Sequence, residues 1–393
     1  FEKLRAPKKL LVGPWSHTYP NSSHCGPRID IHRELLRWWD HWLKGVDNGV
    51  EKEPAVQIYE QHFEEPLADR THIAGSWRMA DALPADPAQI FYVNGDALQG
   101  DTPVQQHAAS VPYLPAACRN GGLWDAGVAF TLPGDQRADS ALAINSANQA
   151  LKTDLCIFGN PSFSLFISAD VEVVPVAARL LDIAPDGTTV LVTKGLINAT
   201  RRNGMDKPLA LVPGEITKVA FHMEATAWRF TKGHRIGLSV NGSDFPNVWP
   251  TPQAGHLTLH WGPEHPSQIA LPVWDGGSDP AFAFQPSPDP PRATGSGQTP
   301  WQVVHDVLED RYRLVLDGLG EMVVSQRDPA RAWINAQKAA TVAWPGLDVR
   351  SEASGSLSSD EHTFTLQLSL HVYANDQLHF HKSWSYSTPR NLL

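Results

Sequence analysis

The stretch Lys8-Lys9-Leu10-Leu11-Val12-Gly13-Pro14-Trp15-Ser16-His17 decides how the fold of this chain is interpreted. Three consecutive apolar residues indicate a short buried strand, and the Gly-Pro pair that follows is typical of the break after a strand. His17 therefore lies in a loop just past the carboxyl end of that strand. In open α/β sheets, binding and catalytic groups collect at this end of the strands. The stretch predicts a catalytic loop close to the start of the chain.

Several later stretches share one feature: they keep the order of motifs found in a known enzyme family. They are Arg37-Trp38-Trp39-Asp40-His41-Trp42-Leu43-Lys44-Gly45, Leu132-Pro133-Gly134-Asp135-Gln136-Arg137, Ala178–Gly187, Phe230–Leu238 and Ser243-Asp244-Phe245-Pro246-Asn247. Together with Gly13–His17, they make the chain resemble CocE/NonD serine hydrolases of the X-Pro dipeptidyl-peptidase (S15) class. That class includes cocaine esterase and α-amino-acid ester hydrolases. The resemblance runs over residues 8 to 250, and residues 301–393 are an addition to the minimal family pattern.

The resemblance implies that His17 is the catalytic histidine of a Ser-His-Asp triad. A serine hydroxyl needs a neighbouring base to become a nucleophile, and histidine can accept and return its proton near neutral pH. Without the flanking sequence, a satisfied loop histidine would be the better interpretation of His17. In α/β-hydrolases the triad follows the order Ser, Asp, His. We therefore expect a missing N-terminal hydrolase half that carries the serine, the aspartate and the oxyanion donors.

No Gly-x-Ser-x-Gly motif occurs in the chain. Gly276-Gly277-Ser278 and Gly295-Ser296-Gly297 lack the strand-turn-helix context of a nucleophile elbow and are expected to be turn or linker sequence. The chain thus holds one third of a triad and no nucleophile. We expect that it cannot turn over substrate alone.

Composition excludes several classes of function. The net charge is −10 without a basic run, which argues against nucleic acid and anionic membrane surfaces as partners. No apolar stretch approaches the roughly 20 residues of a membrane span. Cys25, Cys118 and Cys156 are too few and too far apart for a disulfide framework or a zinc site, so we expect free, mostly buried thiols. No cofactor or metal is expected. Because the chain starts with Phe1, a targeting segment cannot be judged; we favour the cytoplasm over secretion.

The most convincing helix lies in residues 1–75. Asp30 can cap its start and Gly45 suits its end. Six apolar residues recur at helical spacing on one side: Ile31, Leu35, Trp38, Trp39, Trp42 and Leu43. We favour packing against a hydrolase sheet over ligand stacking for this face, because large aromatic residues at helical spacing are usually buried.

The fold class is expected to be mainly β. We expect a C-terminal remnant of an α/β-hydrolase domain (1–75), a jelly-roll β-sandwich (76–284), a Pro/Gly/Ser linker (285–300) and an extra antiparallel β segment (301–393). Short strands at Ser164–Ser168 and Arg235–Val240, and a hairpin turn at Ala184-Pro185-Asp186-Gly187, support the sandwich. The resemblance specifies the jelly roll. The proline-rich linker should be poorly packed. The strict alternation in Thr363–Val372 predicts a strand with one buried face.

Three weaker site hypotheses remain beside His17. His379 and His381 share a strand face and could seat a metal, but no third ligand is evident. Asp182 and Asp186 could suggest calcium, although turn chemistry explains Asp186. Residues 244–247 are interpreted as a structural turn, with a contribution to the substrate pocket left open.

Two functions follow from these observations. The first is the C-terminal part of a serine hydrolase that cleaves a small-molecule ester or amide, of acyl or aminoacyl/X-Pro type, through an acyl-enzyme. The alternative is a non-catalytic, galactose-binding-like jelly roll that binds a carbohydrate or a protein. The tryptophan-rich helix favours the first, because a free module would leave an apolar face bare. The substrate stays unknown, and a homo-oligomer stays open.

Overall fold

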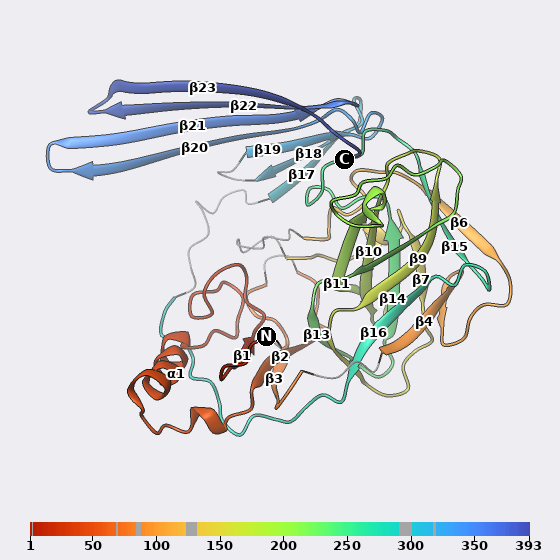
Figure 1. Cartoon of the computed structure of the whole chain (residues 1–393), viewed down its shortest axis with the longest axis horizontal. Coiled ribbons are helices and arrows are strands. Elements are labelled where there is room, and N and C mark those ends of the chain that lie inside the picture. Colours follow the sequence, from red (N-terminus) through yellow and green to blue (C-terminus); the bar gives the residue numbers. More distant parts are fainter. Residues whose placement is uncertain (2, 68–69, 84–87, 123–131, 291–300, 317–319) are drawn as a thin grey trace.

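The fold is mainly β, with strands in two separate sheets and few helices (Figure 1). The computed structural model describes residues 1, 3–67, 70–83, 88–122, 132–290 and 301–316, and 320–393. No helix in these ranges is long and apolar enough to cross a membrane.

The large sheet contains β1 to β16 and follows the order β1-β2-β13-β8-β16-β4-β5-β7-β14-β10-β11, with β3, β6, β9, β12 and β15 attached beside this path. Its strands are β1 (Leu10–Val12), β2 (Val56–His62), β3 (Gly75–Ala80), β4 (Ala88–Asn94), β5 (Ala97–Gln99), β6 (His107–Pro112), β7 (Ile144–Ala147), β8 (Leu155–Gly159), β9 (Ser162–Ala169), β10 (Pro175–Ile183), β11 (Thr189–Asn198), β12 (Thr217–His222), β13 (Thr226–Phe230), β14 (Arg235–Asn241), β15 (His256–Trp261) and β16 (Gln268–Trp274). The short helical elements are η1 (Val50–Lys52), α2 (Arg137–Ser140) and η2 (Ala199–Arg201).

The main hydrophobic core is formed by buried side chains of the strands of this sheet. Ile157, Leu165, Leu180 and Leu238 come from β8, β9, β10 and β14, and all are fully buried. The predicted strands at 164–168 and 235–240 are confirmed within β9 and β14. The hairpin is confirmed too: β10 and β11 pair antiparallel, and Gly187 adopts a left-handed φ of 88° in the turn. Glycine favours this φ because it has no side chain.

The predicted strand at residues 10–12 is confirmed as β1, but it is not buried. Among the described residues β1 pairs only with β2, in parallel, with Leu10 opposite Val56. Leu10 and Leu11 are half-buried and Val12 is 44% exposed. The expectation of burial is wrong for the described chain because β1 is an edge strand with one neighbour.

The predicted helix is confirmed as α1 (Ile31–Lys44) with both expected ends. The Asp30 carboxylate accepts a hydrogen bond from the Arg33 backbone N–H at 3.1 Å, and Gly45 is left-handed with φ 71°. No α1 residue is buried by the described part of the chain. Trp39 is 49% exposed and Leu43 73% exposed. The described residues thus leave most of this face uncovered, with Ile31 and Trp38 half-buried, and its packing on a hydrolase sheet stays a prediction.

Replacing Asp30 by alanine should destabilise α1 by about 1 kcal/mol, because the first-turn N–H groups lose their side-chain acceptor. Amide hydrogen exchange in the first turn of α1 measures this loss as faster exchange. The Asp30→Ser variant keeps an acceptor and serves as the control. Equal exchange in both variants would mean that the cap contributes nothing.

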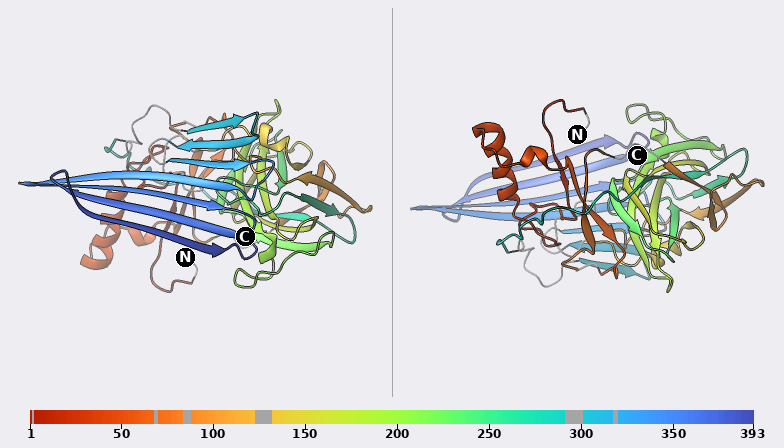
Figure 2. Two further views of the ribbon diagram at one scale, coloured as in Figure 1. Left: turned by 90° about the horizontal axis from the view of Figure 1, so that it is seen from above. Right: turned by 90° about the horizontal axis from the view of Figure 1, so that it is seen from below.

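The second sheet is an antiparallel meander in which each strand pairs with the next one along the chain. Its strands are β17 (Trp301–Asp306), β18 (Arg311–Leu316), β19 (Gly320–Ser325), β20 (Ala332–Trp344), β21 (Leu347–Ser359), β22 (Thr363–Ala374) and β23 (Gln377–Pro389). The last four strands are long and project away from the large sheet (Figures 1 and 2).

The first half of the predicted linker is mostly exposed, but hydrogen bonds tie it to the segment before α1. The Asp30 N–H donates to the Gln285 carbonyl at 2.8 Å, and Asn21 Nδ2 donates to Asp289 Oδ2 at 2.6 Å. Residues 285–290 therefore hold the loop that precedes α1. The second half, with Gly295-Ser296-Gly297, lies outside the described residues.

Candidate active site

His17 lies in the loop between β1 and α1, residues 13–30, which we call the His17 loop. Its side chain is exposed at the surface. β1 runs parallel to β2, so this loop leaves the sheet at the carboxyl end of β1. The structure thus places His17 where the sequence predicts it.

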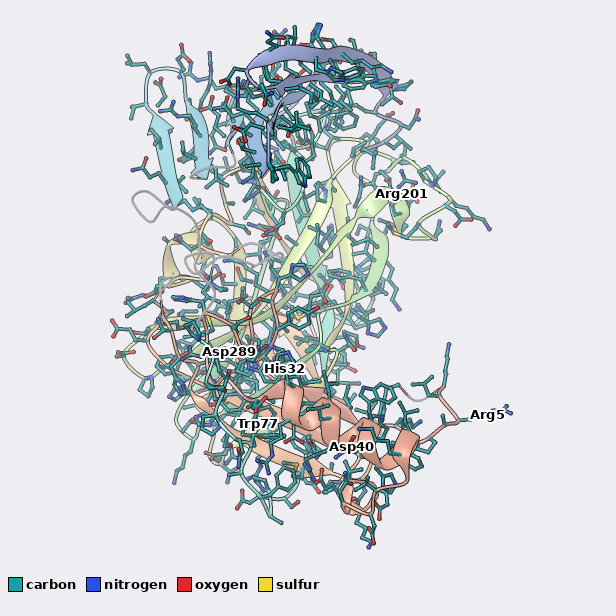
Figure 3. All side chains as sticks on the ribbon, turned by 90° about the vertical axis from the view of Figure 1, so that its left-hand side faces the viewer. Arg5, His32, Asp40, Trp77, Arg201 and Asp289 are labelled. Carbon is teal, nitrogen blue, oxygen red and sulfur yellow. The ribbon has the colours of Figure 1, made fainter. Side chains whose placement is uncertain are left out.

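Trp15 fixes the His17 loop to the large sheet. Its indole N–H donates to the Pro27 carbonyl at 2.8 Å, which joins the two ends of the loop. Its ring centroid lies 5.9 Å from that of Trp77 in β3, and Trp77 in turn lies 4.5 Å from Phe284. Figure 3 shows Trp77 and Asp289 at the same end of the molecule as α1. A side chain at Gly13 would meet the Trp15 ring at 2.6 Å, so this position requires glycine.

Hydrogen bonds hold the loop close to His17 as well. The Ser16 backbone N–H donates to Ser23 Oγ at 3.1 Å, across the loop. The Gly26 N–H donates to the Thr71 carbonyl at 2.9 Å, which ties the loop to the segment before β3. A rigid support around an exposed histidine is what a general base needs, because the base must be held within reach of its proton donor.

Four buried polar atoms of the same loop have no hydrogen-bond partner among the described residues. They are Thr18 Oγ1, Asn21 Oδ1, His24 Nε2 and Arg28 Nε. Most buried polar side-chain atoms in folded proteins are paired, so a group of four in one loop calls for an explanation.

The Trp15→Ala change should lower the free energy of unfolding by about 2 kcal/mol, because Trp15 is only half-buried and a fully buried tryptophan contributes about 3–5 kcal/mol. Urea denaturation measures the loss, and hydrogen exchange should rise across residues 13–30. Tyr19→Ala, at a position that is 72% exposed in the same loop, is the matched control and should leave the midpoint unchanged. If the two variants unfold alike, Trp15 does not anchor the loop.

The motif residues Gln136 and Arg179 meet inside the large sheet. Arg179 Nη1 donates to Gln136 Oε1 at 2.9 Å and lies 3.7 Å from Asp139 Oδ2. Arg179 Nη2 donates to Ser239 Oγ at 2.7 Å. Arg179 is 1% exposed, so this network has no access to a substrate. These residues, which carry much of the resemblance, are structural.

Asp182 and Asp244 are also committed to internal partners. Asp182 accepts hydrogen bonds from the Trp228 indole at 2.9 Å and from His234 Nδ1 at 2.8 Å. Asp244 forms an ion pair with Lys194 at 2.8 Å. Desolvation raises the pKa of both carboxyl groups. Residues 244–247 therefore form a structural turn whose first two residues, Asp244 and Phe245, are buried.

The metal hypotheses find no geometric support. The exposed Asp186 carboxylate accepts the Thr188 N–H at 2.9 Å, as turn chemistry predicts. His381 stacks on His371 with ring centroids 4.5 Å apart. The pairing of β22 with β23 shifts register between Leu378 and Phe380, so His379 and His381 are not regular neighbours on one face of the strand. In the described part of the chain, no group of three or more His, Cys, Asp or Glu residues could hold a metal ion.

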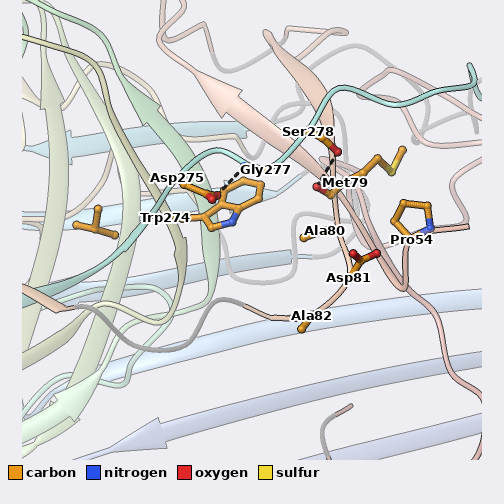
Figure 4. Close-up of a pocket in the computed structure, with 10 residues that line it drawn as sticks. Pro54, Met79, Ala80, Asp81, Ala82, Trp274, Asp275, Gly277 and Ser278 are labelled. Carbon is orange, nitrogen blue, oxygen red and sulfur yellow. Dashed lines mark hydrogen bonds between the residues drawn. The ribbon is translucent and has the colours of Figure 1, made fainter.

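Ser278, the serine of the Gly276-Gly277-Ser278 stretch, is not placed as a nucleophile. Gly276-Gly277-Ser278 forms a turn in which Ser278 exchanges backbone hydrogen bonds with Met79 at 2.9 and 3.0 Å. This turn lines a pocket of about 520 Å³ that also exposes Asp81 and Asp275 (Figure 4), and His17 is not among the lining residues.

The three cysteines are free, as predicted. Desolvation raises the pKa of all three thiols, to about 11 for Cys118 and about 12 for Cys156. A thiol is nucleophilic only as the thiolate, so these groups are inert near neutral pH.

Comparisons with known proteins point in one direction. Residues 48–270 match the family described as the X-Pro dipeptidyl-peptidase C-terminal non-catalytic domain. The chain is 27% identical over 299 residues to a protein named as a serine esterase from Mycobacterium bovis, covering 67% of this chain and 45% of that protein. It is 26% identical over 306 residues to cocaine esterase from Rhodococcus, covering 69% and 52%. An aminopeptidase structure from a marine sediment archaeon (Thaumarchaeota archaeon) has a similar fold, with a TM-score of 0.55 and 19% identity over 68% of this chain and 49% of that one.

The family match covers more than half of the chain and ends before the second sheet begins. The chain spans about half the length of the curated relatives it matches. The chain belongs to the X-Pro dipeptidyl-peptidase C-terminal non-catalytic domain family, and it corresponds to the C-terminal portion of CocE/NonD proteins.

Proposed function

We propose that the chain works as the C-terminal part of a serine hydrolase in which His17 is the general base. The observation that carries this proposal is an exposed histidine on a loop fixed by Trp15 at the carboxyl end of β1. In this proposal residues 1–75 are the end of an α/β-hydrolase domain and residues 76–284 form a jelly roll. The preceding hydrolase part supplies the nucleophilic serine, the aspartate and the oxyanion donors.

The proposed reaction is the cleavage of an ester or amide, of acyl or aminoacyl/X-Pro type. His17 takes the proton of the serine hydroxyl as the oxygen attacks the carbonyl carbon. It then gives that proton to the leaving alcohol or amine, which leaves an acyl-enzyme. In the second half, His17 takes a proton from water as the water oxygen attacks the acyl carbon, and it then returns this proton to the serine oxygen as the acid leaves. The names of the relatives, an esterase among them, support this substrate class.

The uncovered face of α1 supports the same proposal. This face lies on the N-terminal segment and needs a protein surface that the described residues do not provide. A hydrolase domain placed there would bury the tryptophan-rich helix face.

A p-nitrophenyl ester assay tests the proposal with two proteins. The chain of residues 1–393 should give no steady hydrolysis above the buffer rate, because it lacks a nucleophile and oxyanion donors. The polypeptide that includes the preceding hydrolase part should turn over the ester. Steady hydrolysis by residues 1–393 alone would contradict the proposal, and so would an inactive longer polypeptide that is folded.

A further inference from the structure

The strands β20 to β23 have one apolar and one polar face. Residues paired across neighbouring strands share a face, because side chains alternate along each strand. The register aligns Val342 with Val349 and Ala374, and it aligns Lys338 with Ala353, Leu370 and Lys382. We call this side the apolar face. Its large members are Ile334, Val342, Trp344, Leu347, Val349, Leu357, Phe364, Leu366, Leu368, Leu370, Val372, Phe380, Trp384 and Tyr386.

The opposite face is mostly polar, although Trp333 and Leu378 also lie on it. It carries charged and polar side chains at the positions between those of the apolar face: Gln337, Asp348, Arg350, Glu352, Gln367, His371 and His381. Arg350 stacks over Tyr373 on this side. A polar face of this kind is stable in contact with water, whereas the apolar face is stable when other protein covers it.

At its base, the apolar face already packs on protein. The Trp249 ring lies 5.8 Å from Phe364, edge to face, and its indole N–H donates to Ser359 Oγ at 2.8 Å. Val324 and Ala332 are buried beside Phe245 in the same cluster. The prediction of a buried face for Thr363–Val372 is thus met only in part: Phe364 packs on Trp249, whereas Leu368 is 39% exposed.

Toward the tips of the strands, the apolar face is uncovered by the described residues. Trp344 is 54% exposed, Val342 49%, Phe380 44% and Leu347 41%. Large contiguous apolar surfaces of this kind are rare on soluble proteins and mark interaction sites. The uncovered part of the apolar face is continuous with the base that packs on Trp249.

The tips lie on the same side of the large sheet as α1. In Figure 1 the distal halves of β20 to β23 extend above the segment with β1 and α1, and the two views of Figure 2 agree. α1 also leaves apolar residues uncovered, with Leu36 60% exposed and Leu43 73% exposed. Two uncovered apolar surfaces therefore border the same region, one on the sheet and one on the N-terminal helix.

We propose that the distal apolar face of β20 to β23 is an intramolecular docking surface for the hydrolase part that precedes Phe1. This inference rests on the proposed function, because the occupant of the surface is the hydrolase part that the proposed function requires. The matched region makes up only about half of each curated relative, so such proteins carry a further body outside it. The second sheet then acts as an arm that holds the hydrolase part from the side opposite α1.

Charge distinguishes this occupant from a second copy. The charged side chains on the apolar face of β20 to β23 are both cationic, Lys338 and Lys382. Two copies placed face to face would bring lysines together without a carboxylate to compensate, which is unfavourable. A partner with carboxylates at the matching positions fits this face better.

Site-specific photo-cross-linking in the longer polypeptide tests the inference. Benzoylphenylalanine is placed at Trp344, on the apolar face, and at its neighbour Ala343, on the polar face, as the matched control. Leu347, which pairs with Trp344, is a second test position in case the first variant does not fold. We expect cross-links from 344 and 347 to residues that precede Phe1, and none to them from 343.

The outcomes separate the inference from the proposed function. Cross-links that join two copies, or none from 344 and 347 in folded protein, would overturn the docking surface. Labelling of the same samples with a fluorophosphonate reports on the proposed function independently. If a serine before Phe1 is labelled but no cross-links form, the docking surface is wrong and the hydrolase proposal is still supported. If no serine is labelled, the hydrolase proposal and the docking surface that rests on it are both contradicted.

Discussion

The His17→Ala change in the longer polypeptide should lower kcat by about 10⁴- to 10⁶-fold, with little effect on KM. The reason is that the serine loses the only base that can take its proton, while the groups that bind the substrate stay in place. The measurement is steady-state hydrolysis of an activated ester. Added imidazole should restore part of the rate, because a small base can enter the space left by the side chain.

Two other histidines serve as controls for this prediction. His32 lies on α1 and is exposed, so His32→Ala should leave kcat unchanged. His24 lies in the same loop but its Nε2 is buried, so His24→Ala tests whether loop damage alone removes activity. The role of His17 would be contradicted if His24→Ala lowered kcat as much as His17→Ala does and imidazole restored neither variant.

The Arg179→Met change should lower the free energy of unfolding by about 3–5 kcal/mol. Arg179 is buried and donates to Gln136 and Ser239, and it is the cation beside Asp139. Methionine keeps much of the apolar volume but leaves a buried carboxylate without its cation. Urea denaturation of residues 1–393, followed by tryptophan fluorescence, measures the change.

The size of this loss should depend on pH. Desolvation already raises the pKa of Asp139, and removal of the nearby cation raises it further. A carboxyl group with a raised pKa in the folded state stabilises the fold at low pH and loses that contribution as the pH rises. The penalty of Arg179→Met should therefore be smaller at pH 5 than at pH 7.

The matched control is Arg137→Met, which removes an exposed arginine paired with Asp135 in the same motif. Its denaturation midpoint should not move, because exposed ion pairs contribute little. A midpoint for Arg179→Met that equals that of Arg137→Met would mean that the buried network does not stabilise the sheet.

Local patterns in the sequence predicted the elements that local interactions determine. The ends of α1 follow from Asp30 and Gly45, because caps act within one turn of the helix. The β10–β11 hairpin follows from the turn at 184–187. By contrast, the exposure of α1 could not be predicted from its periodicity, because periodicity shows which face is apolar and not what covers it.

Contacts between distant residues were out of reach of the same analysis. The sequence placed His17 in its loop, but it gave no sign that Trp15 packs on Trp77, or that Asn21 bonds Asp289 across 268 positions. The proline-rich composition of 285–290 suggested a loose linker for the same reason: composition does not reveal a partner elsewhere in the chain. The resemblance, rather than any spacing, singled out Gln136 and Arg179, and only the structure shows that they meet.

Mapping the serine that a fluorophosphonate labels in the longer polypeptide tests the central claim most directly. The reagent bonds to the nucleophilic serine of a serine hydrolase, and peptide mass spectrometry locates the adduct. We expect one labelled serine in the part that precedes Phe1, with labelling strongly slowed by His17→Ala. A labelled serine within residues 1–393, or labelling that is indifferent to His17, would contradict it.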